Sequence, residues 1–133
     1  MLKGIHHVSI KCIKDDYDKV RTFYCDILGL KVIREWPDGI MIDVGGDILE
    51  VFNNGVDRLP KGVITHIAFL TDNADDIADK VEKAGYEVFM KPCDKEIPSD
   101  PPYPIRVAFC HGPLGEEIEF FSERESGQDK EKE

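Results

Sequence analysis

The sequence predicts an α+β fold made of two βαβββ modules. Three observations lead to this prediction. The second half of the chain repeats the pattern of the first, each half contains one amphipathic helical stripe that ends at a glycine, and each half closes with an alternating strand. With 133 residues the chain has the size of one domain. We expect that domain at 1–122, with module one at 4–55, module two at 62–122 and a polar tail at 123–133.

Each module begins with a strand pattern that contains a histidine, and an acidic helix start follows it. The matching parts are "HHVSIK" (6–11) with "THIAFL" (65–70), Asp15 and Asp16 with Asp75 and Asp76, and Gly29 with Gly85. Between these points the apolar side chains recur at helical spacing. The first stripe is Tyr17, Val20, Phe23, Tyr24, Ile27 and Leu28, and the second is Ile77, Ala78, Val81 and Ala84.

The end of each module is predicted to be a strand, a glycine-bearing turn and a strand. "GIMIDVGGDILEVF" (39–52) has this pattern in module one, and "IRVAFCHGPLGEEIEFF" (105–121) has it in module two. Module two also holds "PCDKEIPSDPPYP" (92–104), which is too rich in proline for a central strand. We expect a loop there, either a lid over a substrate or an ordinary surface excursion.

Strand alternation predicts which side chains share a face. In the first strand Val8 and Ile10 are expected against the helix, which leaves His7 on the opposite face with Ser9 and Lys11. The same reasoning separates His66 from its apolar neighbours. It also separates Glu50 and Glu119, one near the end of each module, from theirs. Two sheets curled together would therefore bring two histidines and two glutamates to one centre.

Two imidazoles and two carboxylates suit one divalent metal ion, with Ni²⁺ or Zn²⁺ first and Co²⁺, Mn²⁺ or Fe²⁺ as alternatives. Open coordination positions could hold two neighbouring substrate oxygens and stabilise an enediolate, with a glutamate as the base. A single strand histidine is more often structural, and a single glutamate is more often a solvated charge. The duplication favours the metal site. His6, on the packing side, and His111, at a turn, are expected to be incidental.

Composition excludes other classes of function. Seventeen Lys and Arg against twenty-seven Asp and Glu give a net charge of −10, which disfavours nucleic acid and anionic membranes. No segment has the apolar length of a membrane span or a signal peptide, so we expect a cytoplasmic protein. The four cysteines, Cys12, Cys25, Cys93 and Cys110, are far apart and are expected to be reduced thiols.

Several motifs carry a family resemblance. "HHVSI", "FYCDILGLKVI", "LEVF", "THIAF" and "GPLGEEIEF", in this order, resemble the vicinal oxygen chelate superfamily, also called the glyoxalase, bleomycin-resistance and extradiol-dioxygenase superfamily. The resemblance covers Gly4 to about Ser122. It implies paired βαβββ modules whose sheets curl around a metal.

Within the superfamily the chain looks most like glyoxalase I, which uses a His, Glu, His, Glu quartet. The matching positions are His7, Glu50, His66 and Glu119. The resemblance implies conversion of the hemithioacetal of methylglyoxal and a thiol such as glutathione to an S-lactoyl-thiol, with Glu119 as the base and Glu50 as the other catalytic carboxylate. It also implies a homodimer in which His7 and Glu50 meet His66 and Glu119 of a partner chain.

The resemblance also suggests substrate contacts. Asn54 matches an asparagine that helps hold glutathione, and Lys11 stands where short bacterial enzymes place an arginine that binds a glutathione carboxylate. Lysine lacks the bidentate fork of arginine. In module two the residues that could supply the expected positive charge are Arg106 and Lys91.

Two alternatives remain open. One is another metal enzyme of the superfamily, such as an epimerase of methylmalonyl-CoA, although those epimerases carry glutamine at the position of Glu50. Extradiol dioxygenases and fosfomycin-type transferases use three protein ligands, so Glu50 disfavours them too. The other is a metal-free binding protein of the bleomycin-resistance kind, which the complete quartet disfavours. Fold analogy does not choose a substrate, because function depends on the site.

Overall fold

The computed structural model describes residues 1, 3, 5–58 and 66–125. The chain divides into two compact units, Met1–Pro60 and Lys61–Glu133. The predicted modules, 4–55 and 62–122, fall one in each unit. The last strand includes Glu123, the first residue of the predicted polar tail, and residues 126–133 of that tail lie outside the described residues.

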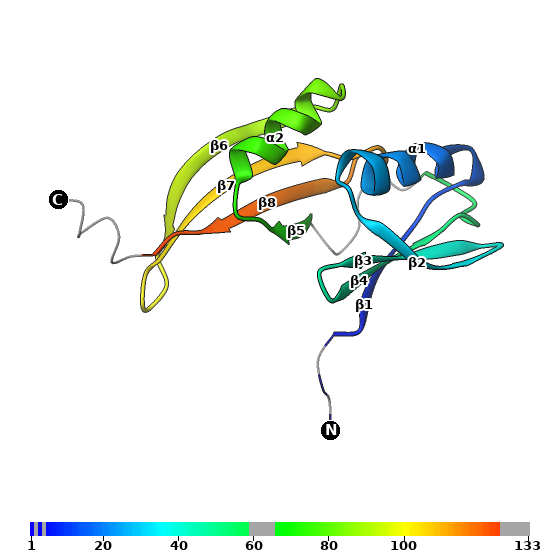
Figure 1. Ribbon diagram of the computed structural model, residues 1–133, viewed down its shortest axis with the longest axis horizontal. Helices are drawn as coiled ribbons and strands as arrows, with labels where there is room; N and C mark the ends of the chain where they lie inside the picture. The colour runs from blue at the N-terminus through cyan, green and yellow to red at the C-terminus, as the bar shows by residue number, and fades with distance from the viewer. Residues whose placement is uncertain (2, 4, 59–65, 126–133) are drawn as a thin grey trace. The chain divides into compact units, whose positions relative to one another are not determined.

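Both units have the predicted order βαβββ (Figure 1). The first contains β1 (His7–Lys11), a 3₁₀ turn (Lys14–Asp16), α1 (Tyr17–Arg21), a π-helical segment (Thr22–Ile27), β2 (Lys31–Trp36), β3 (Gly39–Val44) and β4 (Asp47–Phe52). The second contains β5 (His66–Leu70), α2 (Ala74–Lys83), β6 (Val88–Ile97), β7 (Tyr103–His111) and β8 (Glu117–Glu123). The predicted duplication is therefore confirmed at the level of elements.

The two sheets have the same topology. The strand order is β1-β4-β3-β2 in the first unit and β5-β8-β7-β6 in the second. In each sheet the first strand pairs in parallel with the last, and the other neighbours are antiparallel. The strand that carries the histidine thus lies directly beside the strand that carries the glutamate, although the two are far apart in the sequence.

One face of each sheet belongs to the hydrophobic core. In the first unit Ile40, Ile42 and Val51 are fully buried, as are Val20, Phe23 and Tyr24 of the helical segments. In the second unit α2 lies along one face of its sheet (Figure 1) and buries Ala74, Ala78 and Val81, which recur at helical spacing. Their sheet partners on β7 and β8 are Ala108, Cys110, Ile118 and Phe120. Burial of one large apolar side chain such as Phe120 is worth about 1.5–3 kcal/mol.

The ends of the helices follow the predicted signals. Asn73 caps α2, because its side-chain oxygen accepts a hydrogen bond from the backbone N–H of Asp76 at 3.0 Å. Gly29 and Gly85 both have positive φ, +74° and +97°, which a side chain would make unfavourable. The first helix differs from the prediction. It continues from α1 into wider π-type turns, in which Leu28 donates to the carbonyl of Phe23.

The loop predicted at 92–104 is wrong over most of its length. Strand β6 runs through Pro92 to Ile97 and β7 begins at Tyr103, so the connection is only 98–102. Strand β6 is the edge of its sheet, and Pro92 lies where the pairing with β7 shifts register. An edge position with a bulge tolerates the missing N–H of proline, which a central strand would not.

No helix within the described residues combines the length and the apolar character needed to cross a lipid bilayer.

Candidate metal centre

The first histidine and glutamate of interest lie on the face of their sheet away from the apolar core. His7 is opposite Ile48, and Glu50 is opposite Ser9, in the parallel pairing of β1 with β4. The side chain at position 9 is small, so the imidazole can extend diagonally toward the carboxylate. Nε2 of His7 is 3.4 Å from Oε1 of Glu50. The predicted alternation therefore does bring these two side chains together.

The second unit repeats this arrangement. His66 is opposite Glu117, and Glu119 is opposite Ala68, in the parallel pairing of β5 with β8. Nε2 of His66 is 3.2 Å from Oε1 of Glu119. The same two atoms thus face each other at the same register in both units, and in both a small residue, Ser9 or Ala68, is the next one after the histidine on that face.

The burial of the two partners is unequal in both pairs. The carboxylate side chains are only 10% and 11% exposed, whereas the imidazoles are 36% and 39% exposed. A nearly buried carboxylate loses hydration and needs a positive or hydrogen-bonding partner. Each carboxylate here faces the nitrogen of an imidazole side chain that is more than a third exposed.

The spacing of the donor atoms fits a metal ion. Two donors that are each about 2.1 Å from an ion lie about 3.0 Å apart at a right angle and about 3.4 Å apart at the tetrahedral angle. The observed separations of 3.4 and 3.2 Å lie in this interval. Neutral imidazole and carboxylate are also the ligand types that divalent transition metals accept.

Each pair supplies two donors. Within either unit, the described residues bring no further His, Cys, Asp or Glu to these pairs to make a group of three that could hold an ion.

Aromatic rings line the second pair. The ring of Phe109, which is opposite Glu119 in the pairing of β7 with β8, contacts His66 edge to face at a centroid distance of 5.4 Å. Phe89 contacts Phe109 at 5.6 Å and stacks on His111 at 4.4 Å. Phe109 is not among the predicted site residues, although its pairing with Glu119 places it on the same face.

The first pair has a cation nearby. Lys11 is opposite Phe52, two positions beyond the pairing of Ser9 with Glu50, and its Nζ lies 5.6 Å from the centre of the Phe52 ring. Trp36 contacts the same ring at 5.7 Å. Lys11 is therefore on the face of the sheet that carries His7 and Glu50, as alternation predicts.

Asn53 and Asn54 differ in their surroundings. Asn53 is buried and donates its side-chain N–H to the carbonyl of Pro37 at 3.0 Å, so it stabilises the connection between β2 and β3. Asn54 follows it and is exposed. Of the two amides, Asn54 is the one that can reach a ligand, and it is the one that the sequence resemblance selects.

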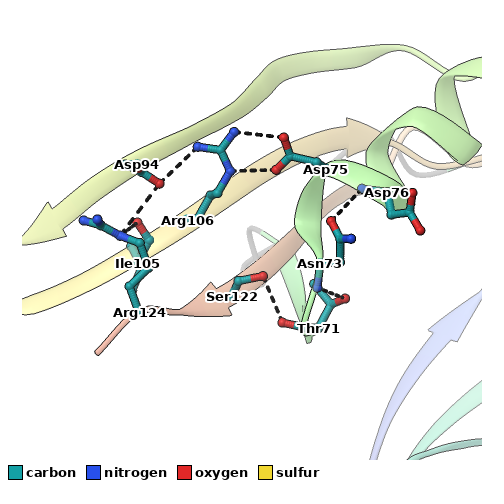
Figure 2. A network of polar contacts seen from close by, with 9 residues as sticks. All are labelled: Thr71, Asn73, Asp75, Asp76, Asp94, Ile105, Arg106, Ser122 and Arg124. Atoms are coloured by element: carbon teal, nitrogen blue, oxygen red, sulfur yellow. Dashed lines mark hydrogen bonds and ion pairs between the residues drawn. The ribbon is translucent and has the colours of Figure 1, made fainter. Parts of the chain in front are cut away.

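Arg106 does not lie on the face of the candidate site. It is opposite Ser122 on the face that α2 covers, and its guanidinium donates two hydrogen bonds to Asp75, at 2.6 and 2.9 Å, and one to Asp94 at 3.0 Å (Figure 2). These hydrogen bonds lower the pKa of Asp75 and raise that of Arg106. Lys91 is also engaged, with Glu82 of α2. This placement argues against the substrate-binding role predicted for Arg106.

The position of His6 differs from the prediction. It precedes β1 and so is not held to the alternation of that strand, and its ring contacts His7 instead of the apolar core. Its Nδ1 is 3.0 Å from Nδ1 of His7. His111 lies with Glu87, whose carboxylate is 2.8 Å from its Nδ1.

All four cysteines are free, as predicted. Burial raises the pKa of the Cys110 thiol to about 12, and burial also raises the pKa of Cys25. A thiol that stays protonated at neutral pH is a poor nucleophile. Neither of these residues is therefore suited to covalent catalysis.

The comparisons with known proteins agree with this architecture. The sequence model of the Glyoxalase/Bleomycin resistance protein/Dioxygenase superfamily matches residues 4–120. The uncharacterized protein YwkD of Bacillus subtilis is 28% identical over 85% of this chain and 91% of its own length. The uncharacterized protein YaeR of Escherichia coli is 29% identical over 92% of this chain and 98% of its own.

A solved structure with the same fold is the lactoylglutathione lyase from Agrobacterium tumefaciens. It superposes with a TM-score of 0.66 at 18% identity and covers 92% of this chain and 95% of that chain. At this identity the likeness concerns the fold. The match over nearly the whole of both modules, together with the duplicated βαβββ units, shows that the chain belongs to the Glyoxalase/Bleomycin resistance protein/Dioxygenase superfamily.

Proposed function

We propose that this protein is a metal-dependent isomerase of the glyoxalase I type, which converts the hemithioacetal of methylglyoxal and a thiol into an S-lactoyl-thiol. The observation that carries the proposal is the duplicated pair, in which Nε2 of a histidine faces Oε1 of a buried glutamate at 3.4 Å in one unit and 3.2 Å in the other. Membership of the superfamily and the likeness of fold to a lactoylglutathione lyase support it.

The metal ligands in this proposal are His7, Glu50, His66 and Glu119. Two neutral imidazoles and two carboxylates give a donor set of charge −2, which balances one divalent ion, with Ni²⁺ or Zn²⁺ first and Co²⁺, Mn²⁺ or Fe²⁺ as alternatives. When bound, the ion would lower the energy of negative charge on two neighbouring substrate oxygens. The protein supplies the rest of the chemistry.

Glu119 is the proposed base. Its carboxylate removes the proton from the carbon that bears sulfur and returns a proton to the neighbouring carbon, so the reaction is an isomerisation with no net gain or loss of protons. The ring of Phe109, which is opposite Glu119 on β7, lies against His66 beside this carboxylate. Glu50, which faces Nε2 of His7 at the matching register of the first unit, is the second catalytic carboxylate.

Lys11 and Asn54 are the proposed contacts to the thiol part of the substrate. The ammonium of Lys11 can pair with a carboxylate, and the exposed amide of Asn54 can donate to or accept from a peptide-like group. Glutathione offers both kinds of group. Arg106 is not part of the set, because Asp75 and Asp94 engage it on the other face of the sheet.

We also propose that the protein acts in the cytoplasm as a homodimer with shared sites. In that arrangement His7 and Glu50 of one chain complete the ligand set with His66 and Glu119 of its partner. Membership of the superfamily supports the dimer, and the resemblance to glyoxalase I is what suggests sharing.

The first experiment measures turnover of the methylglyoxal–glutathione hemithioacetal by chelator-stripped protein, with Ni²⁺, Zn²⁺, Co²⁺ and Mn²⁺ added back separately. We expect formation of S-lactoylglutathione that depends on the metal. Metal binding without turnover would contradict this substrate and direct the test to other thiols and to acyl-CoA epimerisation. Absence of metal binding would contradict the metal centre and favour a binding protein.

The role of the base is tested by Glu119→Gln. We expect kcat to fall by roughly a hundredfold or more, with a much smaller change in KM, because the amide keeps the shape but cannot take a proton. Glu117→Gln is the matched control, since Glu117 is two residues earlier on the same face of β8. Equal kcat values for the two variants would remove Glu119 from this role.

A further inference from the structure

His6 is not one of the proposed ligands, but it contacts His7, which is. Nδ1 of His6 is 3.0 Å from Nδ1 of His7, and the two rings meet edge to face with centroids 5.2 Å apart and planes at 87°. We infer that His6 is a positioning residue that accepts a hydrogen bond from Nδ1–H of His7 and so fixes the metal-binding tautomer of that ligand. The inference rests on the proposed metal centre.

The contact requires one proton between the two nitrogens. A neutral imidazole has one N–H donor and one nitrogen with a free lone pair. At 3.0 Å two Nδ1 atoms are at hydrogen-bond distance, so one ring donates and the other accepts. The direction of this bond decides which nitrogen of His7 is free to bind a metal.

Metal binding by His7 selects one direction of the hydrogen bond between the two Nδ1 atoms. Nε2 of His7 faces Oε1 of Glu50, so Nε2 is the nitrogen on the side of the candidate site. A metal at Nε2 needs its lone pair, which places the single ring proton of His7 on Nδ1. His6 then accepts that proton through its own Nδ1. With the opposite direction the proton of His7 would sit on Nε2 and point at the carboxylate, where it would oppose a cation.

The backbone allows this contact because His6 lies just outside β1, whose pairing with β4 begins at His7. Within a strand two successive side chains would point to opposite faces. Because His6 lies outside the strand, its side chain is not held to the opposite face, and its ring contacts that of His7. A ligand histidine normally donates its second N–H to an oxygen acceptor, and loss of such a partner typically weakens metal binding by 10–100-fold. Here the acceptor is another imidazole.

The test compares His6→Leu with His6→Asn. Leucine removes the acceptor, whereas the side-chain oxygen of asparagine lies close to the place of Nδ1 and keeps one. Affinity for Zn²⁺ and Ni²⁺ is measured on stripped protein by competition with a chromogenic chelator, without any turnover. We expect His6→Leu to weaken binding by roughly 10–100-fold and His6→Asn to retain most of the affinity.

His111→Leu is the matched control, because it removes another part-exposed histidine, one that is paired with Glu87. We expect that variant to bind metal like the wild type. Wild-type affinity in His6→Leu, or an equal loss in His6→Leu and His6→Asn, would overturn the inference. A wild-type protein that binds no metal would instead refute the proposed function, so the two failures are distinguishable.

A second readout reports the tautomer directly. In Zn²⁺-loaded protein, long-range ¹⁵N–¹H correlations of the imidazole rings should show His7 with a protonated Nδ1 and a metal-bound Nε2. His6→Leu should shift the Nδ1–H signal of His7 and speed its exchange with water. Coordination of Zn²⁺ through Nδ1 of His7 would overturn the inference, because His6 occupies that side of the ring.

Discussion

At the scale of single residues, the two glutamates set the character of the candidate site. A carboxylate that is only 10% or 11% exposed is an expensive feature in a small sheet, and a leucine or glutamine of similar size would be easier to bury. Both units bury such a carboxylate at this cost in desolvation, and in both its partner is an imidazole nitrogen. Retention of such a pair is easier to explain by function than by stability.

Lys11 permits a prediction at the same scale. Lys11→Met keeps the length of the side chain and its packing on Phe52 but removes the charge. We expect KM for the hemithioacetal of a carboxylated thiol such as glutathione to rise several-fold, with kcat nearly unchanged, because the lost contact lies away from the reacting carbons. The hemithioacetal of 2-mercaptoethanol, which has no carboxylate, serves as the control substrate. An equal rise in KM for both substrates would contradict a carboxylate contact.

At the scale of elements, Arg106 connects three parts of the second unit. It lies on β7, donates to Asp75 in the first turn of α2, and donates to Asp94 on the edge strand β6 (Figure 2). Arg124 of the last described segment also approaches Asp94, at 3.7 Å, and donates to the carbonyl of Ile105 at 3.2 Å. The network therefore holds α2 and the strands together on the face away from the candidate site.

The network predicts a pH-dependent stability. The hydrogen bonds from Arg106 lower the pKa of Asp75 below its ordinary value of 3.8, so the folded protein binds this proton less readily than the unfolded chain. The stabilisation is therefore complete above that ordinary value and is lost as the pH falls through the lowered pKa. We expect Arg106→Gln to have a lower Tm than the wild type at neutral pH, and the difference to shrink in acid.

Thermal unfolding of both proteins over a series of pH values checks this expectation. Lys95→Gln, which removes an exposed positive charge from β6, is the control for net charge. A constant difference in Tm at every pH would show that packing, and not the ion pair, is responsible. Turnover of Arg106→Gln should equal that of the wild type, whereas a raised KM would restore the substrate-binding role.

At the scale of the whole molecule, the two units repeat each other down to atomic contacts. His7 and His66, Glu50 and Glu119, and Phe52 and Phe121 occupy the same register positions of parallel strand pairs. The backbone N–H groups of Cys12 and Thr71 donate to Phe52 and Phe121 in the same way, both at 2.9 Å. Each unit thus presents one histidine–glutamate pair on a parallel strand pair.

Shared sites predict complementation between inactive chains. His7→Ala and His66→Ala should each lose activity as homodimers, because every site lacks one ligand. In mixed dimers one of the two sites has all four ligands, so subunit exchange should restore up to about a quarter of wild-type activity, since half of the dimers are mixed and half of their sites are intact. Exchange verified by mass spectrometry without recovery of activity would show that each site lies within one chain.

Much of this architecture could be predicted from the sequence, because duplication tests each inference twice. The alternation of "IHHVSIK" and "THIAFL" correctly placed His7 and His66 away from the apolar face, and "ILEVF" and "EIEFF" did the same for the glutamates. Secondary structure was predicted less well where the composition of a segment favours one structure and its position in the sheet favours another. Proline suggested a loop at 92–104, but the edge position of β6 accommodates Pro92 within a strand.

The differences between expectation and structure at single residues have one cause. Arg106 was selected because the resemblance leads us to expect positive charge in module two, and neither composition nor resemblance reveals that Asp75 and Asp94 engage it. Alternation from Phe109, which shares the face of Glu119, would have placed Arg106 on the opposite face. His6 was assigned by the alternation of a strand that begins one residue later. In both cases the decisive information is the exact limit or register of a strand, which sequence patterns give least reliably.

Among the positions at which the two modules differ on the face of the candidate site, that of Lys11 is one that changes the charge. Four residues after the histidine, the first module has Lys11 over an aromatic ring, and the second has Leu70, which is 74% exposed. If Glu50 and Glu119 lay on opposite sides of a planar enediolate and either could return the proton to the same carbon, both mirror-image products would form. With a charge on one module and an aliphatic group on the other, a site that uses both would bind the substrate in one orientation. The lactoyl product should then form as a single enantiomer.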